Sequence, residues 1–94
     1  MKTSEQRVSE TRRQHAEAVI ARHLCQLFRR LPMLCGFWLR PNLQVQGVSV
    51  LSSSGGTTRA ELYEQIAQSV VDLTDEHPDA AQLIRGRTFA RAVH

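Results

Sequence analysis

Two apolar patterns of different period, joined by a short polar loop, constrain this chain more than any other feature. Residues 37–39 and 43–51 are short apolar segments with aromatic and β-branched side chains, which is typical of strands. A polar, glycine-containing loop follows at 52–56, and beyond it the apolar residues recur every three or four positions. This change of period predicts a strand-to-helix unit that the rest of the chain must cover.

The two apolar segments are separated by Pro41-Asn42, which predicts a tight turn. Proline presets φ for the first corner of such a turn, and asparagine tolerates the second. We therefore expect residues 36–40 and 43–51 to pair as an antiparallel hairpin. A single long strand after Pro41 is the alternative.

The second apolar segment contains a shift in its alternation. Leu43 and Val45 share one parity along the strand. Val48 and Val50 have the opposite parity, and Gly47 lies at the shift. A β-bulge at Gly47 adds one residue to the strand, so both halves could point their valines toward the core.

Amphipathic helices are predicted on either side of the hairpin. The first covers about residues 12–31 and should end before Pro32, because proline disfavours the helical conformation of the preceding residue. The second begins at Thr58, which forms a capping box with Glu61. Apolar residues at helical spacing mark the faces to be buried: Ala16, Ile20, Leu24, Leu27, Phe28 and Leu31 in the first helix, and Leu62, Ile66, Val70 and Leu73 in the second.

The two ends of the chain carry weaker signals. Residues 1–11 lack an apolar stripe, so we expect a frayed segment or an exposed helical extension. Pro78 predicts a short helix over 78–85, and Gly86 in the left-handed conformation would stop it. Residues 87–94 alternate like a strand but also contain alanines, and we expect a helical or irregular tail there.

The expected fold is a small two-layer α+β domain in the order helix, β-hairpin, helix, short helix. At 94 residues the chain has room for one domain, which we place at residues 12–94. Two strands do not make an independently stable sheet, and a chain of this size buries only about 60 to 65% of its unfolded surface. We therefore expect a homodimer that shares the sheet edge at 43–51 or packs the first helices together. Phe37 and Trp38 are the candidate partner contacts, because aromatic residues anchor interfaces.

The net charge of +3 conceals a strong asymmetry between the two parts of the chain. Residues 1–40 hold eight basic and three acidic residues, a net charge of +5, whereas residues 41–94 hold four and six, a net charge of −2. We expect the opposite charges of these two parts to pair with each other, within one chain or across a dimer. The alternative is a surface for nucleic acid, an acidic protein or another anion, formed by Arg12, Arg13, Arg22, Arg29, Arg30 and Arg40.

A third hypothesis places an anion at the start of the second helix. Backbone amides at a helix N-terminus, approached through glycine and joined by hydroxyl groups, can bind phosphate or carboxylate. The candidate residues are Ser54, Gly55, Gly56, Thr57 and Thr58. Because the loop lacks the glycine spacing of nucleotide-binding motifs, an ordinary connection is the preferred interpretation.

No sequence arrangement of nucleophile, base and acid is recognisable, so we identify no catalytic residues and expect no cofactor. Cys25, Cys35, His15 and His23 lack the close pairing of zinc ligands, and no metal site is predicted. The two cysteines are expected to be buried, reduced thiols, and no window reaches the roughly 18 apolar residues of a membrane span. The sequence thus favours a small cytoplasmic interaction or regulatory module, without catalytic activity and without a membrane partner.

Overall fold

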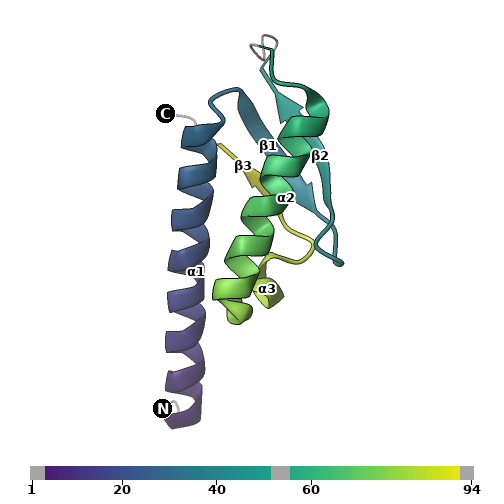
Figure 1. Cartoon of the computed structure of the whole chain (residues 1–94). Helices are drawn as coiled ribbons and strands as arrows, with labels where there is room; N and C mark the ends of the chain where they lie inside the picture. Colours follow the sequence, from purple (N-terminus) through teal and green to yellow (C-terminus); the bar gives the residue numbers. More distant parts are fainter. Residues whose placement is uncertain (1–3, 52–55, 92–94) are drawn as a thin grey trace.

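A three-stranded antiparallel sheet supports the helices on one of its faces (Figure 1). The computed structural model describes residues 4–51 and 56–91, and within these ranges the elements are α1 (Ser4–Arg30), β1 (Leu34–Leu39), β2 (Val45–Val50), α2 (Arg59–Glu76), α3 (Pro78–Ile84) and β3 (Thr88–Ala90). Helices α1 and α2 lie side by side, and α3 packs against both of them. This architecture confirms the α+β fold class. None of the helices in the described ranges combines the length and apolarity needed to cross a membrane.

Strand β1 is central, between β2 and β3. The expectation of a helical or irregular tail is wrong for Thr88–Ala90, which pairs antiparallel with β1, while residues 92–94 lie outside the described part. Backbone bonds from the Leu39 N–H to the Arg87 carbonyl (2.9 Å) and from the Arg91 N–H to the Cys35 carbonyl (2.8 Å) flank this pairing. The chain therefore supplies the third strand itself. Strand β2 is one of the two edge strands of the described sheet, as the sequence predicts for 43–51.

Gly36 makes the third strand fit. A Cβ atom at this position would lie 2.7 Å from the Phe89 carbonyl oxygen, which is closer than real Cβ contacts allow. Phe89 is then 6% exposed and its ring centroid lies 5.5 Å from that of Phe37. The strand character of the tail thus depends on a glycine more than fifty positions earlier, which explains why local sequence favoured the wrong structure.

The hairpin turn forms at Pro41-Asn42 as predicted, but both strands differ from their expected limits. The Arg40 N–H donates to the Gln44 carbonyl (2.9 Å), and the Gln44 N–H donates to the Asn42 side-chain oxygen (3.1 Å). Leu43 has a φ of 68°, a left-handed conformation that lies outside the extended range of regular strand residues. For this reason β2 begins at Val45 and not at Leu43.

The bulge at Gly47 is confirmed. Trp38 pairs with Gln46 and Gly36 pairs with Ser49, so β2 has one more residue than β1 between the two pairs. Gly47 has a φ of 62°, which glycine adopts without strain. The valines on either side of it, Val45 and Val48, are both buried.

The predicted helix limits are largely confirmed. Helix α1 ends at Arg30, and the Thr58 hydroxyl accepts a hydrogen bond from the Glu61 N–H (3.1 Å) at the start of α2. Helix α3 ends at Ile84, with Gly86 in the left-handed conformation two residues later. At the other end α1 begins at Ser4, eight residues before the helical pattern starts in the sequence, and its first turns project beyond the rest of the molecule (Figure 1).

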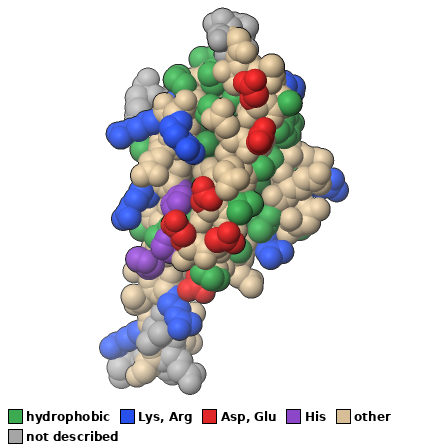
Figure 2. All heavy atoms as spheres, viewed as in Figure 1, with side chains coloured by type: hydrophobic (Ala, Val, Ile, Leu, Met, Phe, Trp, Pro, Cys, Tyr) green, Lys and Arg blue, Asp and Glu red, His purple; other side chains and the backbone are tan. Residues whose placement is uncertain are grey.

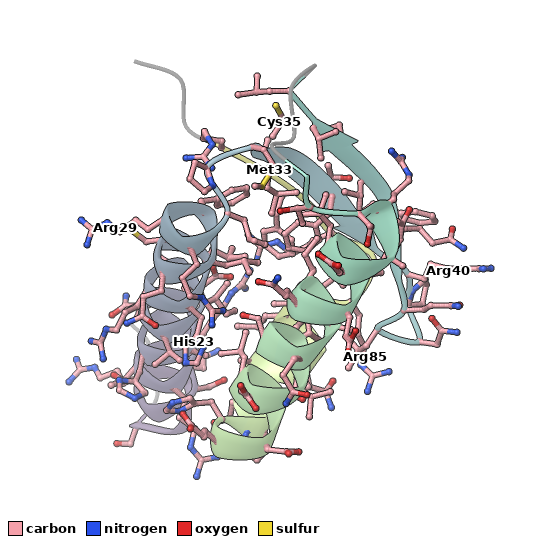
Figure 3. The ribbon with its side chains drawn as sticks, turned by 45° about the horizontal axis from the view of Figure 1, so that its top comes forward. His23, Arg29, Met33, Cys35, Arg40 and Arg85 are labelled. Carbon is pink, nitrogen blue, oxygen red and sulfur yellow. The ribbon has the colours of Figure 1, made fainter. Side chains whose placement is uncertain are left out.

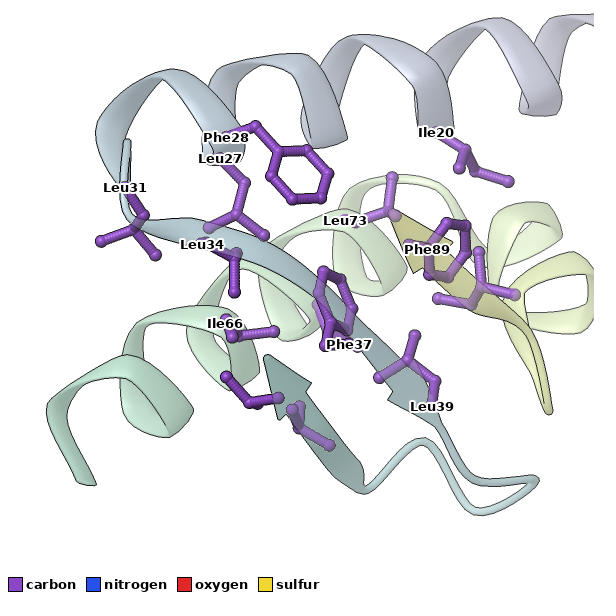
Figure 4. Packing of buried hydrophobic residues seen from close by; sticks show 14 of the residues in the cluster. Ile20, Leu27, Phe28, Leu31, Leu34, Phe37, Leu39, Ile66, Leu73 and Phe89 are labelled. Atoms are coloured by element: carbon purple, nitrogen blue, oxygen red, sulfur yellow. The ribbon is translucent and has the colours of Figure 1, made fainter. Parts of the chain in front are cut away.

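The core lies between the helices and one face of the sheet (Figure 4). It brings together Ile20, Leu27 and Phe28 of α1, Leu31 just after that helix, Leu34, Phe37 and Leu39 of β1, Ile66 and Leu73 of α2, and Phe89 of β3. Apolar burial of this kind stabilises by about 25 cal/mol per Å² and fixes how α1 and α2 sit on the sheet. The opposite face of the sheet takes no part in this core.

Candidate functional site

The sheet face that points away from the helices is the first candidate site. Trp38 pairs with Gln46 on one side and with Thr88 on the other. Because directly opposed residues of antiparallel strands share a face, this row lies on the outer surface, next to a second row formed by Ser49, Gly36 and Ala90. Trp38 is 36% exposed, and its outward-facing neighbours in these rows are small or polar. The face thus presents one large aromatic side chain among small and polar neighbours.

The two candidate partner contacts have opposite environments. Phe37 is 2% exposed and belongs to the core, where its ring centroid lies 6.3 Å from that of Phe28. It cannot reach a partner, and this half of the prediction is corrected. Trp38 follows it in β1, so the alternation of the strand places Trp38 on the outer face. Of the pair, only Trp38 is accessible.

The edge of β2 is the second exposed feature of the sheet. Strand β2 has one neighbour, β1, among the described strands, so its other side carries backbone groups that a further strand could pair with. The Arg59 guanidinium donates to the Val48 carbonyl oxygen (2.9 Å) from the first turn of α2. This contact ties the edge to the helix and opposes the addition of a strand at the middle of β2.

The six candidate arginines are exposed but do not form one surface. Arg40 lies beside the hairpin turn, and Arg29 projects from α1 into solvent (Figure 3). Basic side chains along α1 face acidic side chains over α2 across the front of the molecule (Figure 2). A hollow of about 400 Å³ between these helices is lined by Arg29, Arg30, Asp72 and Glu76 among others. The binding of nucleic acid, an acidic protein or another anion by these arginines stays a prediction.

The candidate anion loop falls partly outside the described residues, because Ser54 and Gly55 are among 52–55. Of the remaining candidates, Gly56 and Thr58 are exposed and Thr57 is half-buried. The Thr58 hydroxyl already accepts a bond from the Glu61 N–H, and the Glu61 carboxylate sits in the first turn of α2. A carboxylate at this helix end repels a second anion, which weakens the hypothesis of a phosphate site.

A cluster that the sequence did not predict lies where α1 meets the corner between α2 and α3. His23 Nε2 and His77 Nε2 each lie 4.0 Å from Glu76 Oε2. The His15 ring, two turns earlier on α1, has its centroid 6.3 Å from that of His77. His23 projects from the side of α1 that faces α2 (Figure 3). Three imidazoles and one carboxylate therefore converge at this corner.

Only the two histidines of α1 could be placed near each other from the sequence. His15 and His23 lie on one side of α1, but His77 and Glu76 come from a segment far along the chain, and only the packing of the helices unites them. The two cysteines, in contrast, belong to no cluster in the described ranges. Both thiols are free, Cys35 is half-buried, and Cys25 is exposed, so the expectation of burial is wrong for Cys25.

Searches against protein-family models, curated proteins and solved structures find no match to this chain. The function therefore has to be inferred from the chain's own surfaces.

Proposed function

We propose that this chain is a noncatalytic cytoplasmic interaction module that self-associates through the open face of its sheet. The observation that carries the proposal is the position of Trp38, an exposed indole in the central strand whose neighbours in the two paired rows are small or polar. Tryptophan is the residue type that most often contributes a large share of binding energy at an interface.

The shape around Trp38 favours a second copy as the partner. In a two-fold symmetric dimer the same patch meets itself, so each copy contributes one indole and the small residues beside it. The exposed Ser49 and Ala90 lie in the row beside Trp38, and their small side chains leave room for an indole from the other copy. Face-to-face packing of two sheets buries such residues in a layer about 10 Å thick.

The small core supports the same proposal. A chain of this size gains a modest margin of stability from its own core, and burial of the Trp38 indole against a second copy adds to it. The edge of β2 is a weaker route to a dimer, because the Arg59 guanidinium holds the Val48 carbonyl. We therefore place the interface on the face of the sheet and not on its edge.

Sedimentation velocity of the full chain and of two variants tests the proposal. The wild-type chain should sediment as a dimer at high micromolar concentration and dissociate on dilution, and Trp38→Ser should sediment as a monomer throughout. Val71→Ser is the matched control, because Val71 is an exposed apolar residue (48%) on α2, away from the sheet face. It should dimerise like the wild type. A monomeric wild-type chain at all concentrations, or a Trp38→Ser dimer of unchanged affinity, would refute the proposal.

A further inference from the structure

The histidine and glutamate cluster lies in the helical layer, on elements separate from the face of Trp38. We propose that His23, Glu76 and His77 bind one divalent transition-metal ion of the zinc type, with water completing the coordination. This inference does not depend on self-association, because none of the three ligands belongs to the sheet.

The spacing of the ligand atoms suits a small ion. The two imidazole nitrogens and the carboxylate oxygen all lie within 4.8 Å of one another, and both nitrogen-to-oxygen distances are 4.0 Å. Zinc bonds of about 2.0 to 2.2 Å in a tetrahedron require ligand atoms roughly 3.4 Å apart. Each nitrogen-to-oxygen distance must shorten by about 0.6 Å, and the distance between the two nitrogens by no more than about 1.4 Å. The Glu76 side chain is 66% exposed and can rotate to meet the ion.

The backbone holds both histidines in place before an ion binds. His77 ends α2 with its N–H bonded to the Leu73 carbonyl (2.9 Å), and its own carbonyl accepts from the Ala80 N–H (2.9 Å) at the start of α3. Pro78, the first residue of α3, restricts the chain further. His23 is half-buried on a helix whose neighbouring residues Ile20 and Leu27 are in the core. Rigid support of this kind lowers the entropy lost on coordination.

The donor set selects the class of ion. Two imidazoles and one carboxylate suit zinc, cobalt, nickel or copper, whereas magnesium and calcium prefer oxygen ligands throughout. Among the described residues, the ion-pair contacts of Glu76 are with these two histidines. Its carboxylate is therefore directed toward the two nitrogens. Zinc is the ion of this class that we expect to bind, and it is the ion to titrate.

The site is open to solvent, and the net charge of the residues around it is close to zero. Glu76 borders the hollow of about 400 Å³ beside His23 and a second hollow of about 490 Å³ beside His77. The charged residues that line these hollows with Glu76 are Arg29, Arg30 and Asp72 in the first, and Arg12 and Asp79 in the second. Three arginines and three carboxylates balance, so no excess positive charge repels a cation. An ion in this position exchanges with solvent and binds reversibly.

Coordination would connect α1 to the corner between α2 and α3. The ion binds the folded chain, which holds His23 next to Glu76 and His77, and it binds the unfolded chain much more weakly. By mass action, zinc at a hundredfold excess over its dissociation constant should raise Tm by about 10 °C. His15 is not among the ligands, since the three ligand atoms that lie within 4.8 Å of one another do not include it.

The test measures zinc binding to the full chain by titration calorimetry and repeats the thermal unfolding with zinc. One zinc per chain should bind, and His23→Gln and His77→Gln should each weaken binding by at least about tenfold. His15→Gln removes a neighbouring imidazole, and Glu64→Gln removes an exposed carboxylate elsewhere on α2. Both controls should bind within about twofold of the wild type. Circular dichroism without metal verifies that each variant is folded.

Cobalt substitution identifies the ligands independently of affinity. Bound Co²⁺ should give the intense visible bands of a four-coordinate site without the thiolate charge-transfer band that Cys25 or Cys35 would produce. Zinc affinity in the double variant His23→Gln/His77→Gln equal to that of the wild type would overturn the site. A thiolate band, or a loss in His15→Gln as large as that in His23→Gln, would overturn the ligand assignment.

Discussion

The Arg91 side chain joins the C-terminal end of α1 to the sheet, and its removal should destabilise the fold more than removal of the Arg85 side chain. Its guanidinium donates to the Phe28 carbonyl (2.7 Å), the Leu31 carbonyl (2.8 Å) and the Leu34 carbonyl (3.0 Å). It also lies 5.1 Å from the centroid of the Phe28 ring. These carbonyls belong to the end of α1 and the start of β1, where a positive charge also favours the helix dipole.

The expected loss in Arg91→Met follows from these contacts. Hydrogen bonds from a charged donor contribute about 1.5 to 3 kcal/mol each when they are protected from water. Arg91 is half-buried, so water replaces part of each bond, and about 1 kcal/mol for each of the three is a reasonable value. The free energy of unfolding should fall by about 3 kcal/mol, and Tm by on the order of 15 °C.

Urea unfolding at one protein concentration, followed by Trp38 fluorescence and by circular dichroism, measures this loss. Arg85→Met is the matched control, because within residues 4–51 and 56–91 the exposed Arg85 side chain donates one hydrogen bond, to the Pro41 carbonyl (3.1 Å). It should cost no more than about 1 kcal/mol. If the free energies of unfolding of Arg91→Met and Arg85→Met differ by less than about 0.5 kcal/mol, Arg91 does not hold α1 to the sheet.

The other predictions concern the third strand and the basic surface. Gly36→Ala should lower the free energy of unfolding by about 1 to 3 kcal/mol, because the new methyl group displaces the Phe89 carbonyl. Amide hydrogen exchange should show the loss of protection concentrated in β3. An equal loss of protection over the whole sheet would contradict this explanation. Gel-shift titrations with generic DNA and RNA at low salt should show no retardation, because the candidate arginines spread over several faces. Retardation at a Kd of about 10⁻⁴ to 10⁻⁶ M that is lost in Arg29→Gln/Arg30→Gln would establish the nucleic-acid alternative instead.

Signals that act over a few residues were sufficient to predict most of the elements. Pro32 ends α1 and Thr58 caps α2 through contacts within one helical turn, and Gly47 forms its bulge through its own φ. The shift in valine parity also identified which side of β2 faces the core. Each of these features depends on backbone conformations that adjacent residues determine.

Features that depend on distant contacts could not be predicted from local patterns. The tail becomes a strand because Gly36 leaves space for the Phe89 carbonyl and because Arg91 bonds to the end of α1. The cluster of His23 and His77 likewise forms only when α1 packs beside the corner of α2 and α3. Phe37 and Trp38 are adjacent and equally aromatic, and the pleat of β1 alone decides that Phe37 is buried.

Trp38 is the chain's single tryptophan, so its fluorescence tests the central claim most directly. The measurement is the emission maximum and acrylamide quenching of Trp38 across a dilution series of the full chain. Burial of the indole between two copies predicts blue-shifted, protected emission at high concentration that becomes red-shifted and quenchable on dilution, in parallel with dissociation. Emission and quenching that stay constant and solvent-exposed at every concentration would contradict an interface at this face.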